Sequence, residues 1–366
     1  MKKIIFFVDL ISNGGFESHL YNLCWELRGK KQPLSISIFS NHTNPNVKIF
    51  EERHQLRVSI FGSPRYNENI YQKSFANIVR FFLITQDIFF FRKVTVYFSS
   101  INKIWWIYFK VISYVRKIKV VYNPVGDPVA ISSKIKRNIN LIKKVNPIII
   151  VESQTHFDLL PRIYENIFIL PHISNIIKTD CVQKNISLFF RIAFLGRLDY
   201  HKGVMSILDV YKKLNIENSI LTFYGSEGDA IEQLKRAVSE DEFLLGKVIF
   251  EPGWRSSNEL KEIHRNIDLV LLLSKSEGLP LTLIECLAYG TPFVATNIGS
   301  INEMVKDIPL GYLINTQDVE NIDIYELRQF IMGLLNTQNE RQVLINLFNR
   351  KYSREVLFPK YLDLIC

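Results

Sequence analysis

The chain has 366 residues, which at about 150 residues per domain predicts two domains. Its composition, 47% hydrophobic and 22% charged, excludes a disordered or collagen-like chain. The four cysteines lie far apart and lack CxxC spacing, which argues against a zinc site or a disulfide framework and favours a reducing compartment.

The net charge of +9 is unevenly distributed along the chain. Residues 1–180 contain 25 Lys and Arg against 12 Asp and Glu, whereas residues 181–366 contain 20 against 24. Two halves with different partners would produce this asymmetry, and so would an excess of solvated lysines. No run of about 18 uncharged apolar residues occurs, so no membrane-spanning helix is expected. Asp9 interrupts the opening run MKKIIFFVDLI, which we interpret as a buried strand and not a signal peptide.

Short apolar, β-branched runs alternate with helical patterns in the first half. Strands are predicted at 3–9, 34–40, 57–62, 94–98, 119–123, 147–152 and 166–171. Helices are predicted at 17–29, 72–84, 102–117, 133–145 and 155–164. Such nearly continuous apolar runs are typical of parallel strands that are covered on both faces.

A polar stretch at 174–190 is interpreted as a linker, after which the alternation restarts. Strands are predicted at 191–196, 219–225, 247–251, 268–273, 292–296 and 311–314. Helices are predicted at 204–214, 228–240, 258–266, 281–289 and 300–305, and a helical tail covers 324–366. The sequence therefore predicts an α/β protein with two doubly wound domains in series. Ligands of open α/β sheets bind at the carboxyl ends of strands, so we expect the ligand in the cleft between the domains.

Two loops that follow predicted strands carry residues suited to anions. Gly14 and Gly15 follow the first strand and lead into a helix, whose unpaired N–H groups could bind an anion, although a plain turn fits equally well. In the loop GRLDYHKG, Arg197 and Lys202 lie five residues apart before another helix. A guanidinium fork and an ammonium group suit a pyrophosphate, although both could be solvated loop charges.

The stretch Ser276–Thr296 is the most informative part of the sequence. Glu277 ends the loop after a very apolar strand, and Glu285 follows eight residues later on a helix. Gly278 permits a close backbone approach, and Pro280 suits the first helical turn. Two carboxylates so placed can accept hydrogen bonds from sugar and ribose hydroxyls. The alternative is that Glu277 is only an N-terminal carboxylate stabilised by the helix dipole.

Together these motifs resemble the GT4 group of retaining glycosyltransferases, which have the GT-B fold. The matching stretches are GGFES, GRLDYHKG, the E-x7-E of EGLPLTLIE, AYGTPFVA and GS--NEMV. They cover most of the chain and are most specific in its second half. The resemblance implies two Rossmann-like domains facing across a cleft. Residues 1–175 would form the acceptor side and 176–349 the nucleotide-sugar domain, with a helix at about 350–366 packing back on the first.

The resemblance also implies residue roles. Arg197 and Lys202 would hold the diphosphate of a UDP- or GDP-sugar and stabilise the leaving group, so neither a metal nor a cofactor is expected. Glu285 would bind the ribose hydroxyls, and Glu277 would orient the donor sugar. The remaining implied donor-binding residues are Gly15, Gly278, Leu279, Pro280, Leu281 and Trp254, the last beside the base unless it is a core or surface aromatic.

One departure from the family pattern concerns the acceptor side. The family often has a His after a first-domain strand, whereas this chain has VVYNPVGDP (Val120–Pro128). Asp127 is a candidate acceptor-side base in that place, although an Asp before Pro is also an ordinary turn, and Asn123 is the other option. His172, where the family often has Asn-Gly, is interpreted as structural or as a hinge residue, and His201 as shaping its loop.

Residues 78–93 and 101–119 combine aromatic and basic side chains, among them Trp105, Trp106, Tyr108 and Phe109 beside Lys103 and Lys110. Such a mixture suits an anionic membrane surface, and the family resemblance favours that interpretation. A buried crossover helix is the alternative. No nucleic-acid recognition motif is present, so no such partner is expected. We therefore expect a cytoplasmic protein held peripherally at the inner face of the plasma membrane.

The sequence as a whole predicts a metal-independent, hexosyltransferase-type glycosyltransferase. It would move a sugar, with retention of configuration, from a nucleotide-diphosphate sugar to a hydroxyl of a lipid-linked glycan, in bacterial capsule or lipopolysaccharide biosynthesis. Two alternatives stay open. One is a GT-B sugar-nucleotide epimerase, and the other is a non-catalytic scaffold that binds a sugar nucleotide or a polysaccharide.

Overall fold

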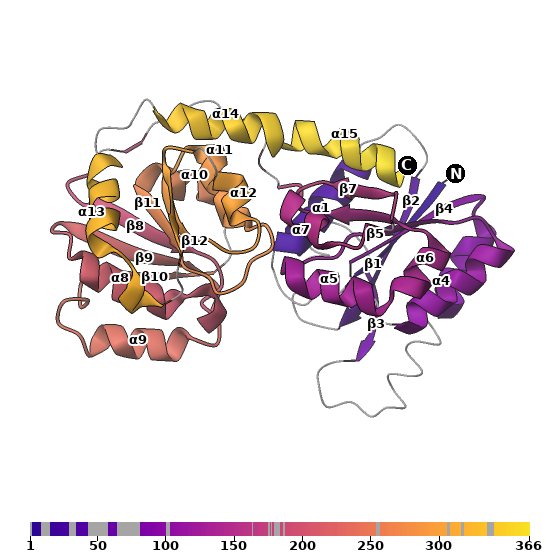
Figure 1. Ribbon diagram of the computed structural model, residues 1–366, viewed down its shortest axis with the longest axis horizontal. Helices are drawn as coiled ribbons and strands as arrows, with labels where there is room; N and C mark the ends of the chain where they lie inside the picture. Colours follow the sequence, from indigo (N-terminus) through magenta and orange to yellow (C-terminus); the bar gives the residue numbers. More distant parts are fainter. Residues whose placement is uncertain are drawn as a thin grey trace. The chain divides into compact units, whose positions relative to one another are not determined.

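The computed structural model describes most of the chain. The described residues are 2–8, 15–28, 34–42, 58–63, 81–99, 103–162, 164–174, 176, 178, 184–185, 187–253, 257–305, 308–315, 318–334 and 340–366. They form two compact units (Figure 1): unit 1 is Met1–Ile173 with Leu357–Cys366, and unit 2 is Ser174–Val356.

Unit 1 is built on a parallel sheet of seven described strands in the order β3-β2-β1-β4-β5-β6-β7. The strands are β1 (Lys2–Val8), β2 (Leu34–His42), β3 (Val58–Ser63), β4 (Lys93–Phe98), β5 (Lys119–Tyr122), β6 (Ile148–Val151) and β7 (Ile167–Ile169). Successive residues of β1 enter different cores, because Ile4 and Phe6 pack in one cluster and Ile5 in another. The sheet is therefore buried on both faces, as its unbroken apolar runs predict.

Helices cover both faces of this sheet. The helices are α1 (Gly15–Arg28), α4 (Lys103–Val115), α5 (Pro128–Arg137), α6 (Ile139–Val145), α7 (Gln154–Leu159) and α15 (Arg354–Ile365), and residues 81–90 are also helical. One core contains apolar residues of α1 and α15, and the other contains those of 81–90, α4, α5 and α6.

The C-terminal helix α15 belongs to unit 1 from Leu357 onward. Leu357, Phe358 and Tyr361 are buried in the same cluster as Ile4 and Phe6 of β1. The Tyr361 hydroxyl donates to the carbonyl oxygens of Leu170 and Pro171, at 3.1 and 3.2 Å. The last helix of the chain thus completes the core around its first strand.

Unit 2 contains a parallel sheet in the order β10-β9-β8-β11-β12-β13. Its strands are β8 (Phe190–Leu195), β9 (Ser219–Gly225), β10 (Val248–Pro252), β11 (Leu269–Leu272), β12 (Phe293–Thr296) and β13 (Gly311–Ile314). Its helices are α8 (Val204–Leu214), α9 (Ile231–Ser239), α10 (Ser257–Asn266), α11 (Leu281–Tyr289), α12 (Ile301–Val305), α13 (Ile324–Gly333) and α14 (Arg341–Lys351), with short 3-10 turns at Tyr200–Lys202 and Val319–Asn321.

The predicted fold class, α/β with two Rossmann-like doubly wound units, is confirmed. Numbered from the first strand of each unit, both strand orders contain 3-2-1-4-5-6, the Rossmann order. Several boundaries differ from the predictions. The helix predicted at 133–145 is two helices, which begin at Pro128 and divide at Asn138, and the tail predicted at 324–366 is three. The helix predicted at 72–84 falls mostly outside the described residues.

Candidate functional site

The strand order of unit 2 fixes where a ligand should bind. The order reverses between β8 and β11, because later strands are added on opposite sides of this pair. In open α/β sheets, the ligand lies at the carboxyl ends of the strands at such a switch point. The loops that leave β8 and β11 there are 196–203 and 273–280. These are the loops in which the sequence placed Arg197, Lys202 and Glu277.

Arg197 is held by a neighbouring carboxylate. Its Nε donates to Oδ2 of Asp199. The Arg197 side chain is 46% exposed, whereas that of Asp199 is only 7% exposed. The Arg197 cation is therefore accessible to a ligand, while its Nε is hydrogen-bonded to the buried carboxylate of Asp199.

Lys202 and Glu277 meet, although 75 positions separate them in the sequence. The Lys202 Nζ lies 2.8 Å from Oε1 of Glu277, and the Ser274 hydroxyl donates to the same oxygen at 2.6 Å. Glu277 is 8% exposed and Ser274 is fully buried. Oε2 of Glu277 accepts no hydrogen bond from any described residue. The dipole-only interpretation of Glu277 is thus incomplete, because the carboxylate has two side-chain partners.

A glycine allows the two loops to pack together. Gly203 has φ +70°, and a Cβ at this position would lie 1.8 Å from the carbonyl oxygen of Leu273. The Lys275 N–H also donates to the His201 carbonyl oxygen at 2.8 Å. Only a residue without Cβ permits this approach. The backbone therefore sets the distance between Lys202 and Glu277.

The segment before α11 offers free amides. Pro280 precedes the helix and has no N–H. Of the four residues predicted to bind the donor here, only Gly278, Leu279 and Leu281 can therefore donate a hydrogen bond from the backbone. None of these three amides donates to another described residue. The Gly278 carbonyl oxygen instead accepts from Ser300, both from the amide at 3.3 Å and from the hydroxyl. The free N–H groups at a helix start form an anion-binding feature.

Glu285 lies on α11, about two turns after Glu277. Its side chain is half-buried, and burial raises its pKa to about 8. Within the described part of the chain it makes neither a hydrogen bond nor an ion pair. A carboxyl group held out of water without a protein partner is a candidate for contact with a ligand.

The predicted residues of unit 1 are described in part. Gly15 is the first residue of α1, while Gly14 lies outside the described residues. Asp127 caps α5: its Oδ1 accepts from the amides of Val129 and Ala130, each at 3.0 Å. The Asp127 carboxylate is half-exposed, and its Oδ2 accepts from no described residue. Trp254 and its loop fall outside the described residues.

The histidines differ in their surroundings. His172 is fully buried, stacks on His19 with ring centroids 4.6 Å apart, and lies 3.1 Å from Oε1 of Glu152. Burial, with His156 nearby, lowers the pKa of His172 to about 3, which fits a neutral structural residue. His201 is half-exposed, with its Nδ1 3.7 Å from Oδ2 of Asp199.

Comparison with known proteins identifies the segment that carries the unit 2 site. The model of the family described as "Glycosyl transferases group 1" matches residues 185–345. This segment, called the group 1 domain below, is therefore similar to that family. The UDP-Gal:alpha-D-GlcNAc-diphosphoundecaprenol alpha-1,3-galactosyltransferase of Escherichia coli is 28% identical over 198 residues, which cover 51% of this chain and 50% of that enzyme. The chain spans about a third to a half of the length of the first curated relatives that it matches.

Solved structures confirm the GT-B fold over the whole chain. Anabaena Alr3699/HepE, crystallised with UDP and glucose, has a TM-score of 0.74 at 15% identity and covers 98% of both chains. The lipopolysaccharide outer core galactosyltransferase WaaB has a TM-score of 0.73 at 19% identity and covers 99% of both. At these identities the likeness shows the fold, of which the group 1 domain is the second half.

Sequence reasoning missed two residues of the group 1 domain site. Asp199 lies two positions after Arg197, and this short spacing on a loop was the available signal. Ser274 has no such signal, because it follows β11 and contacts Glu277 only through the bend of the loop. Both side chains are almost fully buried beneath the residues that were predicted.

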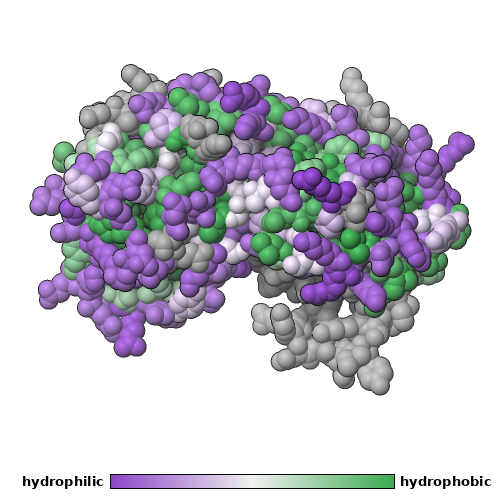
Figure 2. Space-filling view, viewed as in Figure 1, coloured by the Kyte–Doolittle hydropathy of each residue, from purple (hydrophilic) through white to green (hydrophobic). Residues whose placement is uncertain are grey.

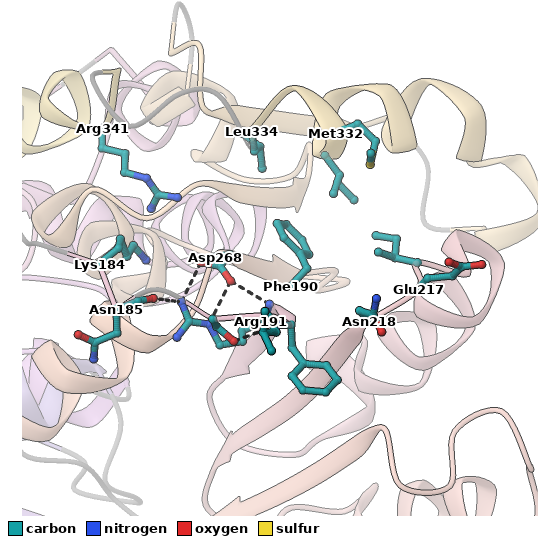
Figure 3. Close-up of a pocket in the computed structure, with 15 residues that line it drawn as sticks. Lys184, Asn185, Phe190, Arg191, Glu217, Asn218, Asp268, Met332, Leu334 and Arg341 are labelled. Carbon is teal, nitrogen blue, oxygen red and sulfur yellow. Dashed lines mark hydrogen bonds and ion pairs between the residues drawn. The ribbon is translucent and has the colours of Figure 1, made fainter.

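A pocket of about 380 Å³ in the group 1 domain lies elsewhere (Figure 3). Its lining includes Phe190, Asn218 and Asp268, which precede or begin β8, β9 and β11. Arg191 and Asp268 pair across it through two hydrogen bonds of 3.1 Å. Because these are the amino ends of parallel strands, the pocket is at the opposite sheet edge from Arg197 and Glu277. None of the predicted site residues lines it.

The aromatic cluster of α4 differs from its predicted role. Trp105, Trp106 and Phe109 are buried in the core of unit 1, so the buried-helix alternative is correct for them. A different set of apolar residues is exposed on α4 and on 81–90, which pack together through contacts of Phe81 with Trp105 and Tyr108. This exposed set, here called the two-helix platform, is Phe82, Phe89, Phe90, Ile104, Ile107, Val111, Tyr114 and Val115. Figure 2 shows hydrophobic patches in the region of α4.

No described helix is long and apolar enough to cross a bilayer. Among the described residues, no cluster of three His, Cys, Asp or Glu side chains is arranged to hold a metal ion.

Proposed function

We propose that the protein is a GT4-type glycosyltransferase that moves a hexose from a nucleotide-diphosphate sugar to a glycan hydroxyl with retention of configuration. The observation that carries this proposal is the convergence of Arg197, Lys202 and Glu277 with three free amides at the switch point of the group 1 domain. The match of that domain to the family, and the fold shared with HepE, support the same conclusion.

The donor diphosphate would bind where cations and amides meet. Arg197 would contact it through its terminal nitrogens, because its Nε is already used. Lys202 would exchange Glu277 for a phosphate oxygen, which would free Oε1 of Glu277 for a hydroxyl of the donor sugar. Gly15 would approach the diphosphate from unit 1, Trp254 would border the base, and Glu285 would accept the ribose hydroxyls. UDP and GDP are the expected nucleotides, in line with UDP bound to HepE.

The reaction separates charge at the diphosphate. The bond between the sugar C1 and the diphosphate oxygen breaks, a bond from C1 to the acceptor oxygen forms, and the acceptor proton leaves. Arg197, Lys202 and the amides of the α11 start would stabilise the negative charge on the leaving diphosphate, the role assigned elsewhere to a divalent metal. We assign the acceptor proton to the free Oδ2 of Asp127.

The nucleotide site is tested by thermal shift with UDP, GDP and their sugars. Binding to the folded state raises the unfolding temperature, so the true donor nucleotide should stand out. Lys202→Ala should remove this shift and the transferase activity. Lys213→Ala is the matched control, because its Nζ also lies 2.8 Å from a carboxylate and its side chain is similarly exposed, 33% against 26%. Equal responses of the two variants would contradict the proposed donor site.

The same assay separates the alternatives. With the donor alone, an epimerase would release the epimeric sugar nucleotide, whereas a transferase would at most hydrolyse the donor to free sugar and nucleotide. A scaffold would bind the donor and leave it intact. Turnover that persists in excess EDTA would support a metal-independent reaction, and a strict requirement for added Mg²⁺ or Mn²⁺ would contradict it.

We further propose that the acceptor is lipid-linked and that unit 1 contacts an anionic membrane surface in the cytoplasm. The E. coli relative, by its name, acts on a diphosphoundecaprenol-linked sugar. The two-helix platform exposes eight apolar side chains, and exposed Lys103 and Lys117 lie on the same helix or directly after it. Apolar side chains beside basic ones suit the boundary of an anionic bilayer.

Vesicle co-sedimentation tests this contact at low salt. The protein should pellet with phosphatidylglycerol vesicles and much less with phosphatidylcholine vesicles. Tyr114→Ser should weaken binding, while Tyr325→Ser in unit 2 should not, although the two tyrosines are 76% and 75% exposed. Equal binding to both vesicle types, or equal effects of both substitutions, would contradict a role for the platform.

A further inference from the structure

Asp199 contacts Arg197, which is proposed to bind the donor diphosphate, and has no role of its own in the function proposed above. Its carboxylate is nearly inaccessible to water, with 7% of the side chain exposed. A carboxylate so placed is unfavourable unless it is paired and hydrogen-bonded. The partners of Asp199 therefore show what it is there to hold.

The two carboxylate oxygens have different partners. Oδ2 accepts from Nε of Arg197, and the His201 Nδ1 lies 3.7 Å from it. Oδ1 accepts from the Asp229 amide at 3.1 Å. A Cβ on Gly228 would lie 2.1 Å from Oδ1, so the loop after β9 can reach Asp199 only with glycine at that position. Asp199 thus connects the loop after β8 with the loop after β9.

The hydrogen bond to Asp199 leaves the terminal nitrogens of Arg197 available to a ligand. A guanidinium group has five N–H donors, and Asp199 takes the one on Nε. The terminal nitrogens of Arg197 donate to no described residue, and the side chain is 46% exposed. The paired terminal N–H groups are the part that binds two phosphate oxygens at once. Contact through Nε therefore orients the fork without competing for it.

Lys202 provides the contrast within the same site. It has a single charged nitrogen, and that nitrogen is the atom paired with Glu277. A phosphate therefore has to share the Lys202 nitrogen with Glu277 or displace it, whereas the terminal nitrogens of Arg197 are not used by Asp199. The two cations of the site are consequently held in different ways. Arg197 is held through Nε, and Lys202 through its charged Nζ.

We infer that Asp199 is a positioning residue, which holds Arg197 through Nε so that the terminal nitrogens are presented in advance to a diphosphate. This inference rests on the proposed function for the identity of the ligand. Its physical basis is preorganisation, since a long side chain that is already ordered loses less freedom when the ligand binds. The loop after β9 becomes part of the site through the Asp229 amide.

A double-mutant cycle measures this coupling. The dissociation constants of UDP and GDP are determined by calorimetry for the wild type, Asp199→Asn, Arg197→Ala and the double variant. Asparagine keeps an oxygen for the Asp229 amide but removes the charge that holds Arg197. We expect Asp199→Asn to weaken binding about tenfold in the wild-type background and less than twofold in the Arg197→Ala background. Equal weakening in both backgrounds would show a role that does not act through Arg197, and the inference would be wrong.

Asp229→Asn is the matched control. Its carboxylate accepts the Tyr200 amide at 2.8 Å, so the substitution removes an equal charge from the same pair of loops without touching Arg197. We expect the dissociation constants to change less than twofold. A loss as large as that of Asp199→Asn would assign the effect to loop integrity or local charge, and would overturn the inference.

A readout without nucleotide separates the inference from the proposed function. In ¹⁵N NMR spectra, the Arg197 Nε–H signal, assigned by its loss in Arg197→Lys, should be protected from solvent exchange in the wild type and unprotected in Asp199→Asn. An unprotected signal in the wild type would refute the role of Asp199 whatever the protein binds. A protected signal in a protein that binds neither UDP nor GDP would instead refute the proposed donor and leave the Asp199–Arg197 contact established.

Discussion

Glu285 makes the free protein less stable at alkaline pH, and replacing it with glutamine should reverse this. The pKa of a glutamate is ordinarily near 4.5, and burial raises that of Glu285 to about 8. Between these values the unfolded chain has released a proton that the folded protein still holds. The folded state then binds more protons, so its stability falls as the pH rises through this interval and levels off above the folded pKa.

The expected size follows from these two values. Each pH unit between them corresponds to about 1.4 kcal/mol, so the interval from pH 5 to pH 8 amounts to roughly 4 kcal/mol for a fully buried group. Because the side chain keeps some exposure to water, we expect about half of this, ~2 kcal/mol. Glutamine has nearly the same shape and never ionises, so Glu285→Gln should recover this amount at pH 8 and very little at pH 5.

Thermal unfolding at pH 5 and pH 8 is the assay. For a unit of this size, ~2 kcal/mol corresponds to a rise of roughly 4–8 °C at pH 8, against less than about 2 °C at pH 5. Glu242→Gln, at an exposed glutamate of unit 2, should change neither value. The same glutamine should weaken UDP or GDP binding, because it removes the proposed acceptor of the ribose hydroxyls. A gain that is equal at both pH values would refute the assignment of the effect to Glu285 ionisation.

Substitutions at three further positions test the packing of the site and of unit 1. Gly203→Ala should destabilise unit 2 by several kcal/mol and abolish donor binding, because its Cβ would lie 1.8 Å from the Leu273 carbonyl oxygen. Gly246→Ala is the control, since Gly246 also has a positive φ but no atom lies within 4 Å of the added Cβ. This control should lower the free energy of unfolding in urea by only about 1 kcal/mol. Asp127→Ser keeps a helix cap and Asp127→Ala does not, so a cap role predicts full stability and activity for Ser, whereas the proposed base predicts loss of activity in both. Tyr361→Phe removes the bonds to Leu170 and Pro171 and should destabilise unit 1 by about 1–2 kcal/mol, with Tyr325→Phe as the exposed control.

The positions of the predicted donor residues followed from the order of strands and loops. Arg197 and Glu277 each lie in the loop that follows an apolar strand, and parallel strands place such loops at the same end of the sheet. The contact between Lys202 and Glu277 could not be predicted in the same way. It depends on Gly203 meeting the Leu273 backbone, and nothing in the sequence identifies the partner of a glycine.

Asp199 shows a second limit of sequence reasoning. Its spacing from Arg197 was visible, but an Asp in a polar loop is usually a turn residue. The bond to Arg197 depends on burial, and burial depends on Gly228 allowing the loop after β9 to cover the carboxylate. The sequence therefore showed that a carboxylate is present at position 199, whereas its burial and its partners could be known only from the folded structure.

The α4 helix is a case in which the structure corrects an interpretation based on the sequence. It is apolar on two faces, and periodicity alone cannot tell which face is the core. The structure buries Trp105, Trp106, Phe109 and Ile112, so one face is accounted for by packing in unit 1. The second face, with Ile104, Ile107, Val111, Tyr114 and Val115, is exposed, so packing within the described part of unit 1 does not account for its apolar character. Exposed apolar patches of this kind mark surfaces that bind something else. Because the two tryptophans are buried, they cannot contact a membrane. The exposed apolar face on the opposite side of the same helix can, and it is the better candidate for that contact.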